Sequence, residues 1–232
     1  DGQKHTVTGY DVTIHEPLYK AADFTFNGTA SVNGSLYATD LVTTLGQARA
    51  TLTANFDQRQ MAYDAKGDIS SLNLGQFLPG MGLGTLDADF AVKGTGTDFF
   101  KPGAWLNADA NIRHLVYNRK NMDDIRLQAN LKNGHAMADI MACNKIIEGT
   151  INLDATLGKE GKRDMLKSTI STQLAHLDLF ALDVTEHPLT IGLSGDVEMS
   201  SNMDDTHYLS GLMEHIYLRD SLQTYYPEKV GL

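Results

Sequence analysis

The stretch ARATLTANFD, residues 48–57, alternates between apolar and polar side chains at every position. Its apolar members are Ala48, Ala50, Leu52, Ala54 and Phe56, and its polar members are Arg49, Thr51, Thr53, Asn55 and Asp57. Successive side chains of a β-strand point to opposite faces, so the stretch predicts a strand with one apolar and one wet face.

The same period of two recurs in six further segments. Their apolar members are Phe24, Phe26, Gly28, Ala30, Val32 and Leu36; Leu86, Ala88, Phe90 and Val92; Leu106, Ala108, Ala110 and Ile112; Ile125, Leu127, Ala129 and Leu131; Ala136, Ala138, Ile140 and Ala142; and Ile151, Leu153, Ala155 and Leu157. No helical periodicity of comparable length precedes the C-terminal region. The sequence therefore predicts an all-β protein of meander strands that share one apolar face.

Turn signals separate these segments. They are Asn33-Gly34, Lys66-Gly67-Asp68, Asn133-Gly134 and the stretch from Gly158 to Gly161. Asn-Gly is the strongest of them, because both residues tolerate the positive φ of a tight hairpin. Near the C-terminus the spacing of residues 209–217 fits either a helix or two strands around Arg219-Asp220, and the β-rich context favours strands.

Composition limits the function classes. The formal net charge of -10 argues against nucleic acid as a partner, since phosphate binding needs clustered Lys and Arg. The one cysteine, Cys143, cannot form an intrachain disulfide, and we expect it to be a buried or half-buried apolar residue. No run of about 18 apolar residues occurs. We interpret the chain, which begins at Asp1, as a piece of a longer protein.

No catalytic or metal-binding pattern emerges. The eight histidines are scattered, and neither HExxH nor CxxC occurs. The stretch from Gly80 to Gly84 leads into an alternating segment rather than a helix, so it predicts a turn and not a phosphate loop. Asp87 and Asp89 lie on the polar side of their segment. We expect a non-enzymatic protein without metal or cofactor.

A weak internal repeat spans about one hundred residues. Leu72-Asn73-Leu74 and Leu177-Asp178-Leu179 share a pattern, and each precedes a glycine-punctuated strand-like segment. The repeat covers residues near 69–160 and 174–232, and we interpret residues 1–232 as one elongated β-repeat module.

This succession resembles the AsmA-like superfamily, in particular a periplasmic fragment of a TamB-type protein from a Bacteroides-like bacterium. The likeness rests on Leu72-Asn73-Leu74-Gly75, the turn at 80–84, the alternating segments that follow, Leu115-Val116-Tyr117 and Asn133-Gly134. It extends over residues 25–232 and lies in pattern rather than in an invariant motif.

The resemblance implies an elongated, curved antiparallel sheet shaped like a half-pipe, with an apolar inner groove. It also implies a periplasmic location, with the parent protein anchored in the inner membrane of a Gram-negative bacterium, and a role in phospholipid transport between the membranes or in outer-membrane assembly. The expected partners are phospholipid acyl chains and an outer-membrane protein. The predicted groove lining consists of the apolar residues given above, beginning with those of residues 48–57, except for the set from Phe24 to Leu36 and for Ala142.

The residues alone leave alternatives open. A face rich in alanine suits either a closed β-sandwich, with sheets about 10 Å apart, or an open trough for an acyl chain. A closed sandwich favours an adhesion or glycan-binding module, for which Trp105 and the C-terminal tyrosines are the only aromatic candidates. We reject a transmembrane barrel, because it needs larger lipid-facing side chains and aromatic girdles, whereas aromatic residues are 8% of this chain and its apolar face is rich in alanine. An open groove and unpaired edge strands both predict self-association.

Overall fold

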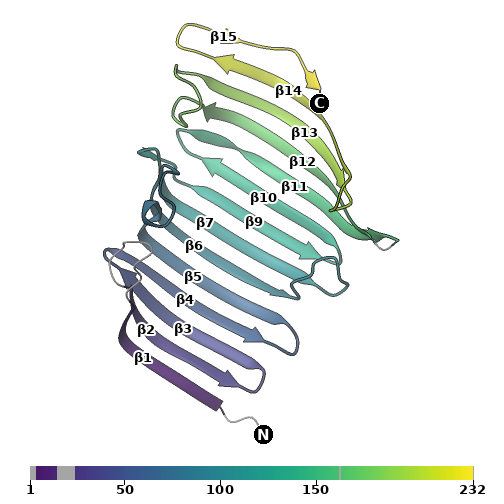
Figure 1. Ribbon diagram of the computed structural model, residues 1–232. Coiled ribbons are helices and arrows are strands. Elements are labelled where there is room, and N and C mark those ends of the chain that lie inside the picture. Colours follow the sequence, from purple (N-terminus) through teal and green to yellow (C-terminus); the bar gives the residue numbers. More distant parts are fainter. Residues whose placement is uncertain (1–3, 15–23, 162, 232) are drawn as a thin grey trace. The chain divides into compact units, whose positions relative to one another are not determined.

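The computed structural model describes residues 4–14, 24–161 and 163–231. Nearly all of it is β-strand, and the only helical element in these ranges is one 3₁₀ turn, η1 (Leu74–Gln76) (Figure 1). The expectation of an all-β protein is confirmed. The chain divides into two units by internal contacts: unit 1 is Asp1–Thr97 with Asn107–Asn121, and unit 2 is Asp98–Leu106 with Met122–Leu232.

Unit 1 is an antiparallel meander. Its strands are β1 (Lys4–Ile14), β2 (Phe24–Asn33), β3 (Leu36–Leu45), β4 (Ala48–Asp57), β5 (Ala62–Asn73), β6 (Leu83–Thr95), β7 (Trp105–Tyr117) and β8 (Lys120–Asn121). The first two residues of β7 group with unit 2. Strands β1 to β7 are ordered in the sheet as in the chain, and β8 forms a hairpin with β7.

Unit 2 repeats this plan. Its strands are β9 (Ile125–Lys132), β10 (His135–Cys143), β11 (Ile147–Glu160), β12 (Arg163–Asp178), β13 (Thr190–Ser201), β14 (His207–Arg219), β15 (Thr224–Tyr225) and β16 (Val230–Gly231). Strands β9 to β14 pair in chain order, and both β15 and β16 pair with β14. The C-terminal region is therefore strand, as its β-rich context favoured.

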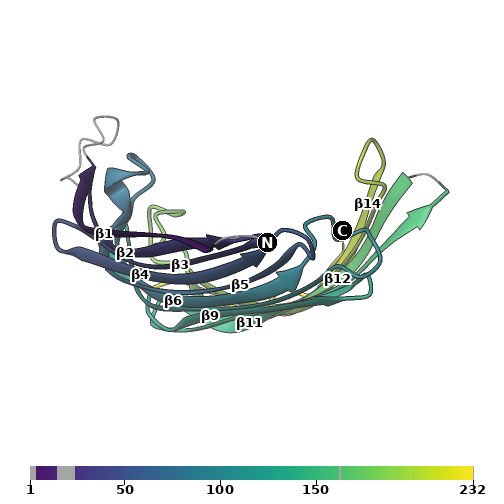
Figure 2. The same ribbon diagram turned by 90° about the horizontal axis from the view of Figure 1, so that it is seen from below.

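Neither unit closes on itself. Among the described residues of each unit, no pairing joins the first strand to the last, so each unit is an open antiparallel sheet one layer thick. The strands within each unit bend along their length (Figure 2). The alternative of a closed β-sandwich is not found within either unit.

Two of the predicted turns form as expected. Gly34 lies in the turn between β2 and β3, and Asn133-Gly134 joins β9 to β10 with φ of 53° and 74°. Gly161, with φ of 65°, follows β11, so that turn lies at the end of the predicted stretch.

The predicted turn at Lys66-Gly67-Asp68 is wrong. All three residues lie inside β5, and the chain reverses between β4 and β5 instead. The glycine serves a different purpose, because the ring of Phe90 on β6 lies directly over it.

The placement of Leu36 is a second error. It pairs with Asn33, so it lies on the side opposite Val32. The tight turn between β2 and β3 resets the alternation, and Leu36 is an exposed residue at the start of β3 rather than part of the preceding apolar set.

Burial is sparse. No large side chain among the described residues is fully buried, and the buried apolar residues are mostly alanines. The accessible surface is 15047 Å², whereas two compact proteins of half this mass would together expose about 12,500 Å². In a single-layer sheet, no second layer of the same unit covers either face. Apolar side chains therefore pack mainly against their neighbours on adjacent strands and not in a core between two layers.

Candidate functional site

In unit 1, the pairing register aligns apolar side chains into rows that cross the strands. One row runs from Leu41 on β3 through Leu52 and Gly67 to Phe90 on β6. The two flanking rows are Ala30, Thr39, Ala54, Ala65 and Val92; and Phe26, Thr43, Ala50, Ile69 and Ala88. Directly opposite residues of paired strands share a face, so the three rows form one surface, here called the apolar face of unit 1.

Aromatic rings occupy one margin of this face. Tyr37, Phe56 and Tyr63 follow each other across β3, β4 and β5, and the ring centroids of Tyr37 and Phe56 are 6.2 Å apart. Burial raises the pKa of the Tyr63 phenol, which fits a hydroxyl at the edge of an apolar surface. The face thus ends in rings that combine an apolar body with a polar tip.

Unit 2 has a face of the same construction. Its rows are Leu127, Ile140, Ile151, Thr172, Gly195 and Met213; Ala129, Ala138, Leu153, Ile170, Val197 and Gly211; and Leu131, Ala136, Ala155, Ser168, Met199 and Leu209. These rows define the apolar face of unit 2. Each row crosses six strands, or about 24 Å at the usual strand spacing.

Apart from Leu106, the predicted lining residues either belong to these rows or lie on the same side of the same unit. In unit 1 they are the alternating residues of β4 and β6, with Ala108, Ala110 and Ile112 of β7. The β7 residues are assigned because Asn111 and Arg113, which alternate with them, bond Asp89 on the polar side of β6. Leu106 groups with unit 2, and we assign it to neither face.

The lining differs in exposure along its rows. Ala48, Leu131 and Ala155 are buried, whereas most of the others are half-buried. The most open part is the first row of unit 2, where Leu127, Ile140 and Ile151 are 37%, 37% and 38% exposed. Three adjacent branched apolar side chains are thus uncovered on neighbouring strands.

Several members of the faces escaped sequence reasoning. On β5, residues Tyr63, Ala65 and Ile69 alternate as the predicted strands do, but the expected turn at Gly67 interrupted the pattern. On β3 the apolar face of unit 1 carries Thr39 and Thr43, and on β12 the apolar face of unit 2 carries Ser168 and Thr172, so alternation by hydrophobicity is weak on these two strands.

The opposite face of unit 1 is joined by ionic and polar contacts. Arg113 approaches Asp68 at 2.9 Å and Asp89 at 2.6 Å. Burial by itself would lower the pKa of Arg113, but its hydrogen bonds to the two carboxylates outweigh that effect and raise it. Asp87 accepts a hydrogen bond from the backbone N–H of Ser71 at 2.5 Å, at the bulge in β5. The polar position predicted for Asp87 and Asp89 is confirmed.

The opposite side of unit 2 has open hollows, among them one of about 550 Å³ and one of about 650 Å³. The larger one contains Met141, Cys143, His215 and Tyr217 in its lining. Cys143 is exposed, so the expectation of a buried or half-buried cysteine is wrong: it follows Ala142 on β10 and points to the other face. The Tyr217 hydroxyl donates to the Ala175 carbonyl at 2.6 Å, which ties β14 to β12.

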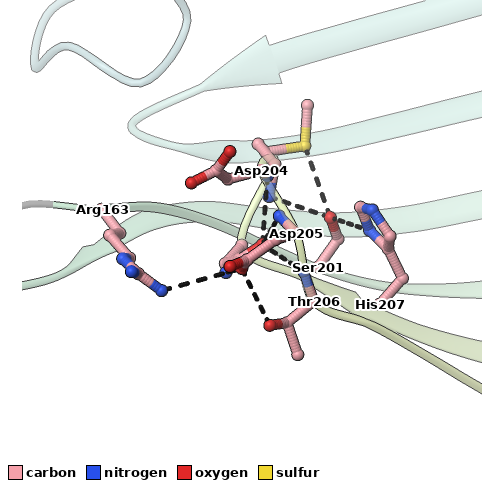
Figure 3. Close-up of polar contacts among 8 residues, drawn as sticks. Arg163, Ser201, Asp204, Asp205, Thr206 and His207 are labelled. Carbon is pink, nitrogen blue, oxygen red and sulfur yellow. Dashed lines mark hydrogen bonds and ion pairs between the residues drawn. The ribbon is translucent and has the colours of Figure 1, made fainter.

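The polar cluster at the β13–β14 hairpin has a structural role (Figure 3). The Asn202 side-chain oxygen accepts backbone N–H groups from Asp204, Asp205 and Thr206 at 2.9–3.0 Å. The Ser201 hydroxyl lies 2.8 Å from His207 Nδ1, its partner across the hairpin, and also accepts from the backbone of Met203. These bonds close the loop, and the pairing of serine with histidine here follows from strand register.

The described residues contain no group of three or more His, Cys, Asp or Glu side chains that would hold a metal ion. Within the same ranges, no helix is long and apolar enough to cross a membrane. What distinguishes the molecule is the pair of apolar faces. Comparison with known proteins gives no relative: no family model, no curated protein and no solved structure matches the chain.

Proposed function

We propose that the two apolar faces bind lipid acyl chains, and that the protein is a non-enzymatic module of a bacterial cell envelope. The observation that carries the proposal is the set of apolar rows that cross each unit, which no described strand or helix of the same unit covers. Large uncovered apolar surface in a folded protein marks a binding site for apolar partners.

The dimensions and energies suit an acyl chain. A row of residues across six strands is about 24 Å long, and the alanines and glycines in the rows project little from the sheet, which leaves room for a chain above them. Each methylene removed from water contributes about 0.8 kcal/mol, so some fifteen buried carbons would contribute about 10 kcal/mol before entropic costs. Such binding requires no charged side chain in the site, in keeping with the purely apolar and hydroxyl-bearing rows.

The biological setting of the proposal comes from the sequence resemblance to AsmA-like proteins of the TamB type. On that basis the module belongs in the periplasm, in a parent protein anchored in the inner membrane, and serves phospholipid transport between inner and outer membrane or outer-membrane assembly. An outer-membrane protein is then its expected partner. The open meander with one apolar face supports this assignment.

A pair of adjacent substitutions tests lipid binding. Ile140 and Met141 are neighbours on β10, are 37% and 51% exposed, and lie on opposite faces. We expect Ile140→Lys to weaken binding of a fluorescent phospholipid about tenfold or more, because it places a charge between Leu127 and Ile151 in the most exposed part of the apolar face of unit 2. The matched control Met141→Lys adds the same charge on the other face and should bind as the wild type does.

Native mass spectrometry of the purified protein supplies a second readout. Copurified phospholipid should be found on the wild type and on Met141→Lys, and less of it on Ile140→Lys. Equal lipid binding by all three proteins would place the lipid elsewhere, and absence of lipid from all three together with no binding of the added phospholipid would refute the proposal.

A further inference from the structure

The outer edge of β1 is an unpaired strand edge. The strand order begins at β1, and among the described residues no strand pairs with its outer side. Its described side chains from Lys4 to Thr8 are all exposed, and Val7 is 71% exposed although it lies opposite Ala30 in a row of the apolar face. A free edge presents alternate backbone N–H and C=O groups without partners, which is a template for another strand.

The usual protections of a free edge are weak on β1. It contains no proline, and its two basic residues, Lys4 and His5, both lie at its start. A bulge interrupts the strand between Gly9 and Val12, where the Asp11 backbone N–H donates to Asn27 Oδ1 at 2.9 Å. The bulge leaves a regular segment from His5 to Gly9 available for pairing.

The other end of the strand order is protected. The C-terminal segment folds back along β14: β15 pairs with Leu218 and Arg219, and β16 pairs with Leu212 and Met213. Lys229 forms an ion pair with Glu214, and Pro227 lies between the two short strands. This segment, residues 220–231, is here called the C-terminal strap. Short strands, proline and lysine are devices that blunt an edge.

We propose that β1 pairs with β1 of a second copy of this chain, antiparallel and around a twofold axis perpendicular to the sheet. Such an axis keeps the apolar faces of both copies on the same side. Two directly opposite residues share a face, so the two members of each pair must be an even number of positions apart in β1. Only registers in which one residue lies opposite its own copy meet this condition. With Val7 opposite Val7, Thr6 lies opposite Thr8 and His5 opposite Gly9, so no like charges meet.

This pairing has two structural consequences. It continues the row that contains Val7, Ala30, Thr39, Ala54 and Ala65 into the second copy, so the apolar surface doubles in width. It also stops at two copies, because an isologous contact uses the same edge of both. The contact is independent of lipid binding and involves only backbone and β1 side chains.

Molar mass in solution is the first test. Sedimentation velocity should show the 25.4 kDa chain shifting toward twice that mass as concentration rises, without larger species. Val7→Lys places two lysines opposite each other at the twofold axis and should leave a monomer, as should Val7→Glu. A mixture of these two variants should regain the dimer, because each lysine then faces a glutamate.

Val32 provides the matched control. It lies on the same face one strand further in, opposite His5, and is 37% exposed. In a Cys143→Ser background, Val7→Cys should form a disulfide-linked dimer under mild oxidation, whereas Val32→Cys should not. Crosslinking through Val32→Cys instead would show that copies meet through their apolar faces, and a wild-type monomer at all concentrations would equally overturn the inference.

Discussion

At the scale of single residues, the apolar face depends on complementary sizes across strands. Gly67 on β5 lies opposite Phe90 on β6, and a β-carbon built at Gly67 would be 2.6 Å from the Phe90 ring and 2.8 Å from the Thr51 carbonyl oxygen. The ring therefore covers the bare backbone of the glycine. This contact fills the centre of the face with one side chain instead of two.

Gly67→Ala should lower the free energy of unfolding by about 1–3 kcal/mol, since overpacking a filled site displaces ring and backbone. The control Gly158→Ala, also within a strand, meets open space and should change stability by less than about 1 kcal/mol, with stabilisation favoured because alanine reduces the freedom of the unfolded chain. Urea denaturation measures both. In a cycle with Phe90→Leu, part of the Gly67→Ala loss should disappear; an unchanged loss would assign the clash to Thr51 alone.

At the scale of elements, alternation predicts strands well where both faces keep to their chemistry. The stretch from Ala48 to Phe56 is β4 almost to the residue, because every second side chain is apolar and the others are polar. Prediction weakened on β12 and β13, where Ser168, Thr172 and Gly195 sit on the apolar face. Small and hydroxyl-bearing side chains pack on the apolar face of these strands. Because similar side chains also occur on the polar face, hydrophobicity does not tell the two faces of the strands apart.

Because of the same strict alternation, the sequence predicted which residues lie on the apolar side of each strand. It did not predict how these residues line up into rows across neighbouring strands. Which residues stand opposite each other depends on turns and on bulges such as the one at Ser71 in β5. The segment Lys66-Gly67-Asp68 has the composition of a turn although it is strand. The role of Gly67 depends on Phe90, which is 23 residues away in the sequence. Local sequence does not carry that information.

The C-terminal strap should loosen in acid. The hydrogen bond and charge of Lys229 lower the pKa of Glu214, and the backbone N–H groups of Gln223 and Leu222 lower that of Asp220. Because both folded values lie below the ordinary ones near about 4, these carboxylates stabilise the strap fully above that range, and the contribution is lost as pH falls through the folded values.

An NMR titration checks this expectation. Below about pH 4, the chemical shifts of the Val230 methyl groups should move toward random-coil values. In Glu214→Gln, part of that change should already be present at neutral pH. Glu198→Gln, on the neighbouring β13, removes a carboxylate that lies opposite Ser210 of β14 and is not the partner of Lys229, and it should behave as the wild type does. A Val230 signal that stays unchanged down to about pH 2 would contradict the role of both carboxylates.

At the scale of the whole molecule, the amount of buried surface is unusually small. An unfolded chain of 25.4 kDa exposes about 37,000 Å². The folded protein exposes 15047 Å², so folding buries about 22,000 Å² where a compact protein of this size would bury about 26,000 Å². The difference is the surface that a second layer would otherwise cover.

The heat capacity of unfolding should reflect that difference. Ordinary proteins gain about 12–15 cal/mol/K per residue on unfolding, in proportion to the apolar surface exposed. We expect a value about one sixth lower for the monomer in calorimetry. A saturating single-chain phospholipid should restore part of the deficit, because its release on unfolding exposes the covered faces and its own chain. Ile140→Lys should reduce the restoration and Met141→Lys should not. An ordinary heat capacity for the lipid-free monomer would show that its apolar faces are already covered.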